Sequence, residues 1–441
     1  MSPWGAGAGA ADMNSAPRSF LFLQGLASWF FDRLGLALAE RGHAVHRVNF
    51  NGGDRLFWRL PGAIDYRGRL DDWPPFLDRL LIEKQVTDLI LFGDCRPVHR
   101  LALPVARRRN VRVHVVEEGY LRPGWITFEE GGVNANSSLP RDPDWYRKAA
   151  AILPAWQESP GPAERFARRA REDVLYTAAR LTAAAWYPHY RTHRARHPLA
   201  EYAGWIRRLA GRRQAEDRAA ATIAALTGVG RPVYLFPLQL DGDYQIRNSA
   251  LGSMRPAIEQ VVASFARHAP PGARLLAKLH PLDDGLVDWA RIMRQTAAQY
   301  GVAERIAVID GGAIEAVLPH TAAMVTVNST AGMQALAQGI PVMALGNAIY
   351  DLPGLTFQGK LEDFWSEATP TDPQLYDAFR RVLAARCLIP GGFFSEAGIG
   401  LAVDAAVNRL KAAEPQPRRA DIAEDGTLTE TGAFAISTAA E

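Results

Sequence analysis

The chain has 441 residues, of which 48% are hydrophobic and 22% charged, with a formal net charge of +3; this length predicts about two domains. Its two cysteines, Cys95 and Cys387, exclude a disulfide-stapled secreted scaffold and favour a reducing compartment. No signal-peptide pattern and no apolar run of about 18 residues is visible, so we expect a protein that is soluble or only peripherally bound to a membrane.

The first part of the chain alternates strand-like and helix-like stretches. We expect residues 1–18, a leader rich in small residues, to be disordered. Residues 19–26, 45–50, 88–92 and 111–116 have the composition of strands, and residues 30–41 carry apolar side chains at helical spacing. Strands that alternate with helices are typical of a parallel sheet. We therefore predict a first Rossmann-like lobe over residues 19–142.

Residues 143–228 have helical composition and are rich in arginine. Between residues 165 and 218 there are thirteen arginines, no lysine and five acidic residues. Arginine clusters suit partners that carry phosphate, such as lipid head groups, nucleotides or nucleic acid. The alternative is a solvated helical face. We set nucleic acid aside because the segment lacks a compact module with interleaved stacking aromatics.

The strand and helix rhythm then returns and predicts a second lobe over residues 229–411. The expected strands are residues 232–238, 274–279, 306–309, 324–327 and 341–345, with helices at 254–268 and 286–300. Residues 412–441 are polar, acidic and aperiodic, and we expect them to be disordered. The predicted fold class is α/β, with two Rossmann-like lobes and an inserted Arg-rich helical segment. Ligands of such sheets bind beyond the carboxyl ends of the strands.

Three loops that follow strands of the second lobe carry polar side chains suited to chemistry. They contain Gln239, Asp241 and Asp243 in PLQLDGDYQIRNSA, Lys278, His280 and Pro281 in KLHP, and Asn328, Ser329, Thr330 and Gly332 in VNSTAGMQAL. In the third loop a helix begins at once, so its first backbone N–H groups would face an anion, and Gly332 would let the backbone approach a ligand. A turn, a strand end and a plain helix cap are the alternatives. The chain has neither GxxxxGK[ST] nor GxGxxG.

The loops of the first lobe contain acidic residues beside glycines. Glu117 and Glu118 precede a glycine in VVEEGYLRPGWITFE, and Arg122 follows. Asn51 lies in FNGGD and Asp94 in FGDCRP. Each of these carboxylates and amides has a structural alternative, since Asp and Asn are frequent in turns.

Taken in order, these motifs resemble the capsular polysaccharide biosynthesis and export family of the KpsS/LipB type. The paired HP and S/T motifs are also similar to those of enzymes that use CMP-activated sugar acids. The resemblance implies a GT-B-like glycosyltransferase: a retaining β-Kdo transferase that uses CMP-Kdo and a (lyso)phosphatidylglycerol-type lipid acceptor to start a poly-Kdo linker. It further implies a cytoplasmic protein on the inner face of the inner membrane, near the poly-Kdo-extending transferase and the capsule export machinery, with no cofactor and no metal.

The resemblance also implies roles for the site residues. His280 would contact the CMP phosphate together with Ser329 and Thr330, and Asp243 would be the nucleophile, with Asp241 and Gln239 as neighbours. Glu118 would be the acid/base, with Glu117 in reserve, and Lys278 and Arg122 would pair with the Kdo carboxylate or the phosphate. The Arg-rich segment would contact the membrane surface. The alternatives are a transferase that uses a UDP- or ADP-sugar, for which Glu315 would bind the ribose, and a non-catalytic scaffold of the export complex.

Overall fold

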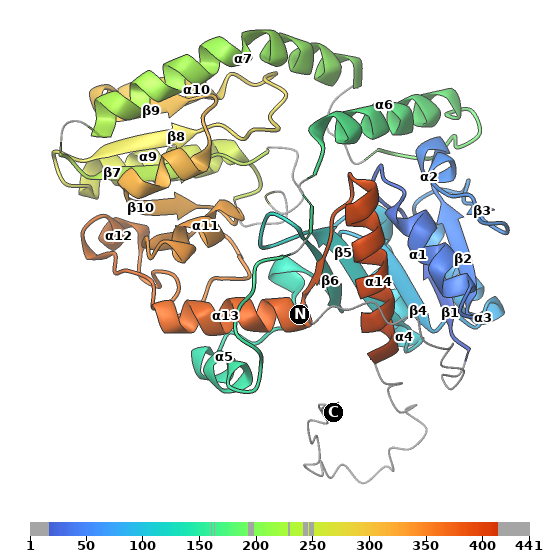
Figure 1. Ribbon diagram of the computed structural model, residues 1–441. Coiled ribbons are helices and arrows are strands. Elements are labelled where there is room, and N and C mark those ends of the chain that lie inside the picture. Colours follow the sequence, from blue (N-terminus) through green and yellow to red (C-terminus); the bar gives the residue numbers. More distant parts are fainter. Residues whose placement is uncertain are drawn as a thin grey trace.

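The computed structural model describes residues 17–159, 161–162, 164–192, 198–227, 230–240, 246 and 251–412. The chain forms two lobes, each built on one sheet (Figure 1). The first sheet has seven strands in the order β12-β6-β5-β4-β1-β2-β3, and the second has five in the order β11-β10-β7-β8-β9. The predicted fold class is confirmed: the protein is α/β with two Rossmann-like lobes in a GT-B-like arrangement.

The first lobe is a mainly parallel sheet between helices. Its strands are β1 (Ser19–Phe22), β2 (Ala44–Asn49), β3 (Ile64–Asp65), β4 (Asp88–Phe92), β5 (Arg112–Glu118) and β6 (Trp125–Glu130), of which β6 runs antiparallel to β5. Its helices are α1 (Phe30–Ala39), α2 (Gly52–Leu56), α3 (Trp73–Glu83) and α4 (Pro97–Arg108), with the short η1 (Asn134–Asn136) after β6. Strand β1 is buried throughout because helices cover both faces of the sheet. The strands β3 and β6 were not predicted.

The second lobe is a fully parallel sheet. Its strands are β7 (Val233–Pro237), β8 (Arg274–Lys278), β9 (Ile306–Ile309), β10 (Thr321–Thr326) and β11 (Val342–Ala344). The helical elements are α9 (Met254–His268), α10 (Trp289–Gln299), η2 (Ala303–Arg305), η3 (Ile314–Ala316), η4 (Leu318–His320), α11 (Ala331–Ala337) and α12 (Leu361–Glu367). The chain runs outward from β7 through β8 to β9 and then crosses to β10. The switch point therefore lies between β7 and β10, where ligands of open α/β sheets bind.

After α13 (Pro373–Arg386) the chain returns to the first lobe. Strand β12 (Leu388–Pro390) pairs antiparallel with β6, and α14 (Glu396–Ala412) packs against α1. These last elements were predicted to belong to the second lobe, within residues 229–411, and the structure places them on the first. A strand of three residues has no signal of its own, because it exists only through its pairing with β6.

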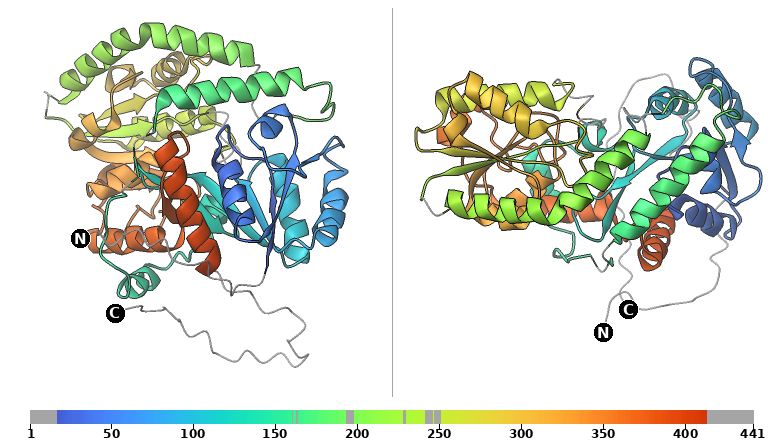
Figure 2. Two further views of the ribbon diagram at one scale, coloured as in Figure 1. Left: turned by 45° about the vertical axis from the view of Figure 1, so that its right-hand side comes forward. Right: turned by 90° about the horizontal axis from the view of Figure 1, so that it is seen from above.

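The described part of the Arg-rich segment forms three helices, which lie on both lobes. Helix α5 (Pro143–Ala150) packs against α13, α6 (Phe166–Thr182) against α2, and α7 (Pro198–Thr227) against β9. Figures 1 and 2 show α6 over the first lobe and α7 over the second, on the same side of the molecule. The two glycines of FNGGD allow α6 to approach, since a Cβ at Gly53 would lie 2.6 Å from the ring of Tyr176. Within the described part of the chain, no helix has the length and apolarity that a membrane span requires.

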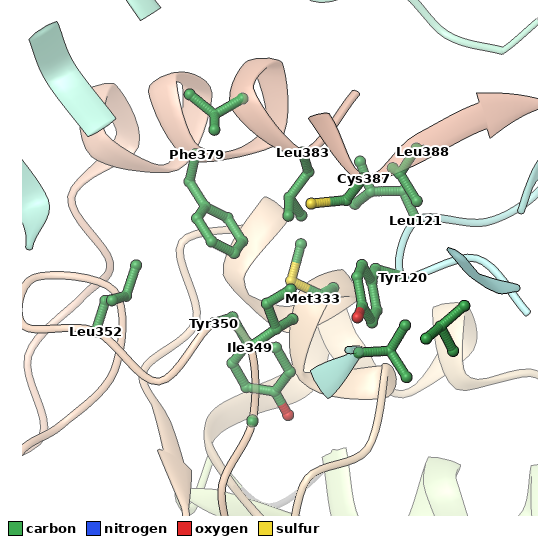
Figure 3. Close-up of a cluster of buried hydrophobic side chains, with 14 of the residues drawn as sticks. Tyr120, Leu121, Met333, Ile349, Tyr350, Leu352, Phe379, Leu383, Cys387 and Leu388 are labelled. Carbon is green, nitrogen blue, oxygen red and sulfur yellow. The ribbon is translucent and has the colours of Figure 1, made fainter. Parts of the chain in front are cut away.

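The largest buried apolar cluster joins the two lobes. Figure 3 shows Tyr120 and Leu121 of the first lobe facing Met333 and Tyr350 of the second, with Cys387 of the returning chain beside them. Burial of apolar surface across this junction stabilises the arrangement of the lobes as well as each lobe. The loops of the two sheets are thereby held facing one another.

Candidate active site

His280 follows β8 and faces a cavity between the lobes. Its Nδ1 accepts a hydrogen bond from the backbone N–H of Leu282 at 3.0 Å, so in the neutral ring the proton lies on Nε2. Burial, together with the charges of Arg122 and Lys278, lowers the pKa of His280 to about 4. At neutral pH the imidazole is therefore an uncharged donor.

The turn that carries His280 is held by an arginine of the helical segment. Arg208 of α7 donates to the backbone carbonyl of Asp283 and forms an ion pair with Asp310, which follows β9. The neighbouring Arg207 donates to the carbonyl of Gly285. These two arginines thus fix the loop after β8.

Lys278 is the last residue of β8 and is 5% exposed. Burial lowers the pKa of its ammonium group, and the charges of Asp310 and Glu315 oppose that effect. Lys278, His280, Pro281 and Glu315 all line a cavity of about 400 Å³, which Arg122 enters from the other lobe. This interlobe cavity has the size of a small-molecule site, about 300 to 1,000 Å³.

The NST loop supplies hydroxyl groups to the same cavity but few free N–H groups. Ser329 and Thr330 line the cavity. The N–H groups of Ala331, Gly332 and Met333 already donate within the loop, to Ser329 Oγ (3.2 Å) and to the carbonyls of Ser329 (2.9 Å) and Thr330 (3.1 Å). The predicted anion site made of free backbone N–H groups at the start of α11 is therefore largely absent. The hydroxyl groups of Ser329 and Thr330 are the donors that the loop offers to an anion in the cavity.

Gly332 has a different role from the one expected. A Cβ at this position would lie 2.4 Å from the hydroxyl oxygen of Tyr350, which donates to the carbonyl of Ser329 at 2.6 Å. The glycine makes room for this tyrosine rather than for a ligand. It thereby helps to fix the position of the NST loop.

Gln239 and Asn328 join the loops after β7 and β10. The side-chain amide of Gln239 donates to Asn328 Oδ1 at 2.8 Å and accepts from the N–H of Asn328 at 3.0 Å. This pair connects the two sides of the switch point. Asp241 and Asp243 lie outside the described residues, so their role stays a prediction.

Glu118 ends β5 between two arginines. Its carboxylate pairs with Arg169 of α6 at 2.5 Å and with Arg122 at 3.0 Å. Burial raises the pKa of this carboxyl, but the charges of Arg169 and Arg122 outweigh burial and hold the pKa below its ordinary value. Glu118 is therefore ionised, the form in which a carboxyl group can accept a proton. Arg169 was missed in the sequence because nothing distinguishes it from the other arginines of its helix.

The other first-lobe candidates serve the structure of their loops. Glu117 accepts from Asn134 at 3.1 Å. Asn51 is buried as the N-cap of α2, where its Oδ1 accepts from two N–H groups and its amide donates to Tyr176. Asp94, also buried, accepts from the N–H of Val133 at 3.1 Å. Of these three, none lines the interlobe cavity.

Aromatic residues that the sequence did not single out form one wall of the interlobe cavity. The rings of Trp125 and Trp156 lie 5.8 Å apart, and the guanidinium of Arg380 lies 5.1 Å from the centre of the Trp156 ring. Flat aromatic and guanidinium surfaces of this kind stack on nucleobases. No sequence signal connects these residues, because they come from three separate segments.

The sequence matches a family described as capsule polysaccharide biosynthesis protein over residues 87–394. The chain belongs to this family. It is 34% identical over 390 residues to the capsule polysaccharide export protein KpsS of Escherichia coli, covering 86% of this chain and 97% of that protein. It is 33% identical over 387 residues to the capsule polysaccharide modification protein LipB of Neisseria meningitidis, covering 86% and 92%. The predicted resemblance is confirmed.

Among solved structures, the chain is similar to the KpsC beta Kdo 2,7 transferase of Thermosulfurimonas dismutans. The TM-score is 0.44 at 13% sequence identity, and the match covers 89% of this chain and 100% of that chain. The span that matches the capsule polysaccharide biosynthesis family, residues 87–394, contains Glu118, Arg169, Lys278 and His280, whereas Asn51 lies before it. Lys278 and His280, which line the interlobe cavity, thus lie within the matched span.

Proposed function

We propose that this member of the capsule polysaccharide biosynthesis family is a glycosyltransferase that moves Kdo from CMP-Kdo to a (lyso)phosphatidylglycerol-type lipid. The observation that carries the proposal is the interlobe cavity, where Lys278 and His280 of one lobe face Arg122 of the other. CMP leaves as a phosphate monoester, so negative charge grows on its phosphate in the transition state. Two cations and a neutral N–H donor stabilise that charge. The aromatic wall of the cavity is suited to the nucleobase.

Glu118 is the proposed base for the acceptor hydroxyl. It lies beside the interlobe cavity and is ionised by its two arginines. An anionic substrate group that draws Arg122 or Arg169 away removes a positive charge from the carboxylate. The proton affinity of Glu118 then rises when the substrate is in place, which favours proton transfer at that moment.

Retention of configuration requires two displacements. In the proposal the Asp243 carboxylate attacks the anomeric carbon of Kdo as the bond to the CMP phosphate breaks. The acceptor hydroxyl then attacks the same carbon, Glu118 takes its proton, and the carboxylate leaves. Asp241 and Gln239 are the neighbours of the proposed nucleophile, and the assignment of Asp243 rests on the family resemblance.

The test is incubation with CMP-Kdo and a lysophosphatidylglycerol analogue, followed by mass spectrometry of lipid and protein. We expect a lipid that gains one or more Kdo groups, and a Kdo adduct on the protein that is lost in Asp243→Ala. Transfer without any adduct, under conditions that trap intermediates, contradicts the double displacement. The absence of transfer to any lipid contradicts the proposed activity.

A thermal-shift comparison of CMP, UDP and ADP tests which nucleotide the protein binds. Glu315 lines the interlobe cavity and accepts a hydrogen bond from Gln334 at 2.9 Å. An acid at this place is the feature that the alternative, a transferase using a UDP- or ADP-sugar, requires. Stabilisation by CMP alone supports the proposal, stabilisation by UDP or ADP supports the alternative, and stabilisation by none supports a non-catalytic scaffold.

The proposed acceptor also gives the protein its proposed place in the cell. A lipid acceptor and a cytoplasmic sugar nucleotide meet at the inner face of the inner membrane, where the protein would bind peripherally. There it would hand its product to a poly-Kdo-extending transferase and the capsule export machinery. No metal is needed for the chemistry proposed, since protein cations face the leaving phosphate.

A further inference from the structure

A groove between α6 and α7 lies next to the interlobe cavity. It has a volume of about 560 Å³ and is lined by Phe166 and Val174 of α6 and by Trp205 and Leu209 of α7. The rings of Phe166 and Trp205 lie 6.3 Å apart and join the two helices. This α6–α7 groove is therefore an apolar site of small-molecule size.

The groove also contains charged groups. Glu118 and Arg169 line it, and so does Arg180. The Nη2 atom of Arg180 is enclosed and has no hydrogen-bond partner within the part of the chain that the structure describes. Arg180 as a whole is half-buried, but an enclosed guanidinium N–H without an acceptor costs free energy, so a ligand that supplies an acceptor oxygen is favoured there.

Several acidic side chains of the groove are already engaged by donors. Asp173 accepts from the hydroxyl of Tyr202 at 3.3 Å, and Asp283 accepts from the indole of Trp289 at 3.1 Å. Neither of these hydrogen bonds involves Arg180. Since Glu118 pairs with Arg122 of the interlobe cavity, it stands where the groove and the cavity meet.

Both helices also expose apolar stripes, which include the groove-lining residues Phe166, Val174 and Leu209. Leu199, Ile206 and Leu209 of α7 are 68%, 69% and 50% exposed, and at 3.6 residues per turn they lie within about 80° of one another. Phe166 and Val174 of α6 are 51% and 49% exposed and lie within a similar arc. Both helices lie on the same side of the molecule (Figures 1 and 2). Exposed apolar side chains gathered in this way mark surfaces that contact a partner molecule or a membrane.

We propose that the α6–α7 groove binds the acyl chain of an anionic single-chain phospholipid. The phosphate lies at Arg169 and Arg180, and the head-group hydroxyl is directed to Glu118. The exposed stripes of α6 and α7 rest on the bilayer, so the lipid enters the groove from the membrane side. This inference rests on the proposed function, because it makes the groove the acceptor site of that reaction.

The test measures binding of 1-palmitoyl- and 1-hexanoyl-lysophosphatidylglycerol, both below their micelle concentrations. The palmitoyl chain has ten more methylenes than the hexanoyl chain, and burial of about four of them in the groove is enough to make the palmitoyl lipid bind about 100-fold more tightly. Leu209→Glu is expected to reduce this advantage at least ten-fold. The matched control is Leu36→Glu on α1, where the leucine is 43% exposed against 50% for Leu209; it is expected to keep the wild-type advantage. A palmitoyl chain carrying bromine atoms is expected to quench Trp205, an effect lost in Trp205→Phe.

Equal affinity for the two lipids overturns the inference, and so does equal weakening by Leu209→Glu and Leu36→Glu. A change in self-association by Leu209→Glu, with lipid binding unchanged, makes the groove an interface between protein copies and also overturns it. Kdo transfer in the same preparation separates the two proposals. Kdo transfer that does not depend on chain length would reject the lipid-binding groove and support the proposed function. Chain-dependent binding without Kdo transfer would reject the proposed function and support the groove.

Discussion

The protonation state of His280 determines what the residue can do for a leaving phosphate. Because its pKa is lowered to about 4, the ring is a neutral Nε2–H donor from pH 6 to pH 8. We expect His280→Ala to reduce kcat about 100-fold, as is found when one donor to a developing anion is lost. The ratio of wild-type to variant rates should stay constant over this pH range.

The His280→Ala prediction needs a control for stability. His280→Gln places an amide N–H near the position of Nε2 and should recover part of the rate. Chemical denaturation of both variants measures the free energy of unfolding. A variant that loses its fold, rather than its turnover, would show that His280 only terminates β8.

Arg169 sets the proton affinity of Glu118. Replacing Arg169 by Gln removes the 2.5 Å ion pair and raises the pKa of the carboxyl, because burial is then opposed by Arg122 alone. The reaction needs ionised Glu118, so the acidic limb of the pH–rate profile should move to higher pH. We also expect kcat/KM to fall on the order of ten-fold, about 1.4 kcal/mol for one charge-assisted bond. Arg169→Lys keeps the charge and is the control; an unmoved acidic limb in Arg169→Gln contradicts the role.

At the scale of elements, we predict opposite effects on stability for alanine substitutions at two glycines of α7. A Cβ at Gly204 would lie 2.1 Å from the carbonyl oxygen of Asp284, whereas a Cβ at Gly211 meets nothing within 4 Å. Gly204→Ala should destabilise the protein by about 1 to 3 kcal/mol through overpacking. Gly211→Ala should stabilise it by about 0.5 to 1 kcal/mol through helix propensity.

The same pair of variants tests how α7 positions the site. Displacement of α7 at Gly204 also moves Arg208, which holds the turn that carries His280. CMP binding, measured by thermal shift, should weaken in Gly204→Ala and stay unchanged in Gly211→Ala. Equal CMP binding in both would mean that the turn holds its shape without α7.

At the scale of the whole molecule, the sequence predicted both sheets because each lobe repeats the strand and helix rhythm. It also named Lys278 and His280 as site candidates because they end a strand, and both line the interlobe cavity, although their roles stay predictions. It did not predict Arg169, because an arginine-rich helix contains several equivalent candidates. Only the docking of α6 at Gly52 and Gly53 directs this one to Glu118, and that contact joins segments far apart in the chain.

The return of the chain to the first lobe after α13 was also not predicted, for the same reason. Strand β12 has three residues and forms because β6 offers an unpaired edge, so its existence depends on tertiary structure. The local pattern of apolar residues therefore predicts the lobes. The junction between them depends on contacts between residues that are far apart in the sequence, so a short stretch of sequence does not predict it. Cys387, at the end of α13, packs at this junction beside Tyr120 (Figure 3).

The junction also contains a buried acid that should make stability depend on pH. Burial raises the pKa of Glu129 on β6 from 4.5 to about 7, although Ser137 and Tyr120 donate to its carboxylate. Between pH 4.5 and 7 the folded state keeps a proton that the unfolded state has lost. The free energy of unfolding therefore decreases as pH rises through this window, and above it the ionised group costs about 3 kcal/mol.

Glu129→Gln removes the ionisable group and should flatten this dependence. Relative to the wild type, its free energy of unfolding should rise by about 3 kcal/mol between pH 5 and pH 8, measured by chemical denaturation. Glu130→Gln, at the exposed neighbouring position of the same strand, is the control and should follow the wild-type curve. Parallel curves for Glu129→Gln and the wild type would mean that the carboxyl ionises in place without cost. The junction between the lobes would then be more polar than its packing indicates, because an ionised group is stable only where water or donors solvate it.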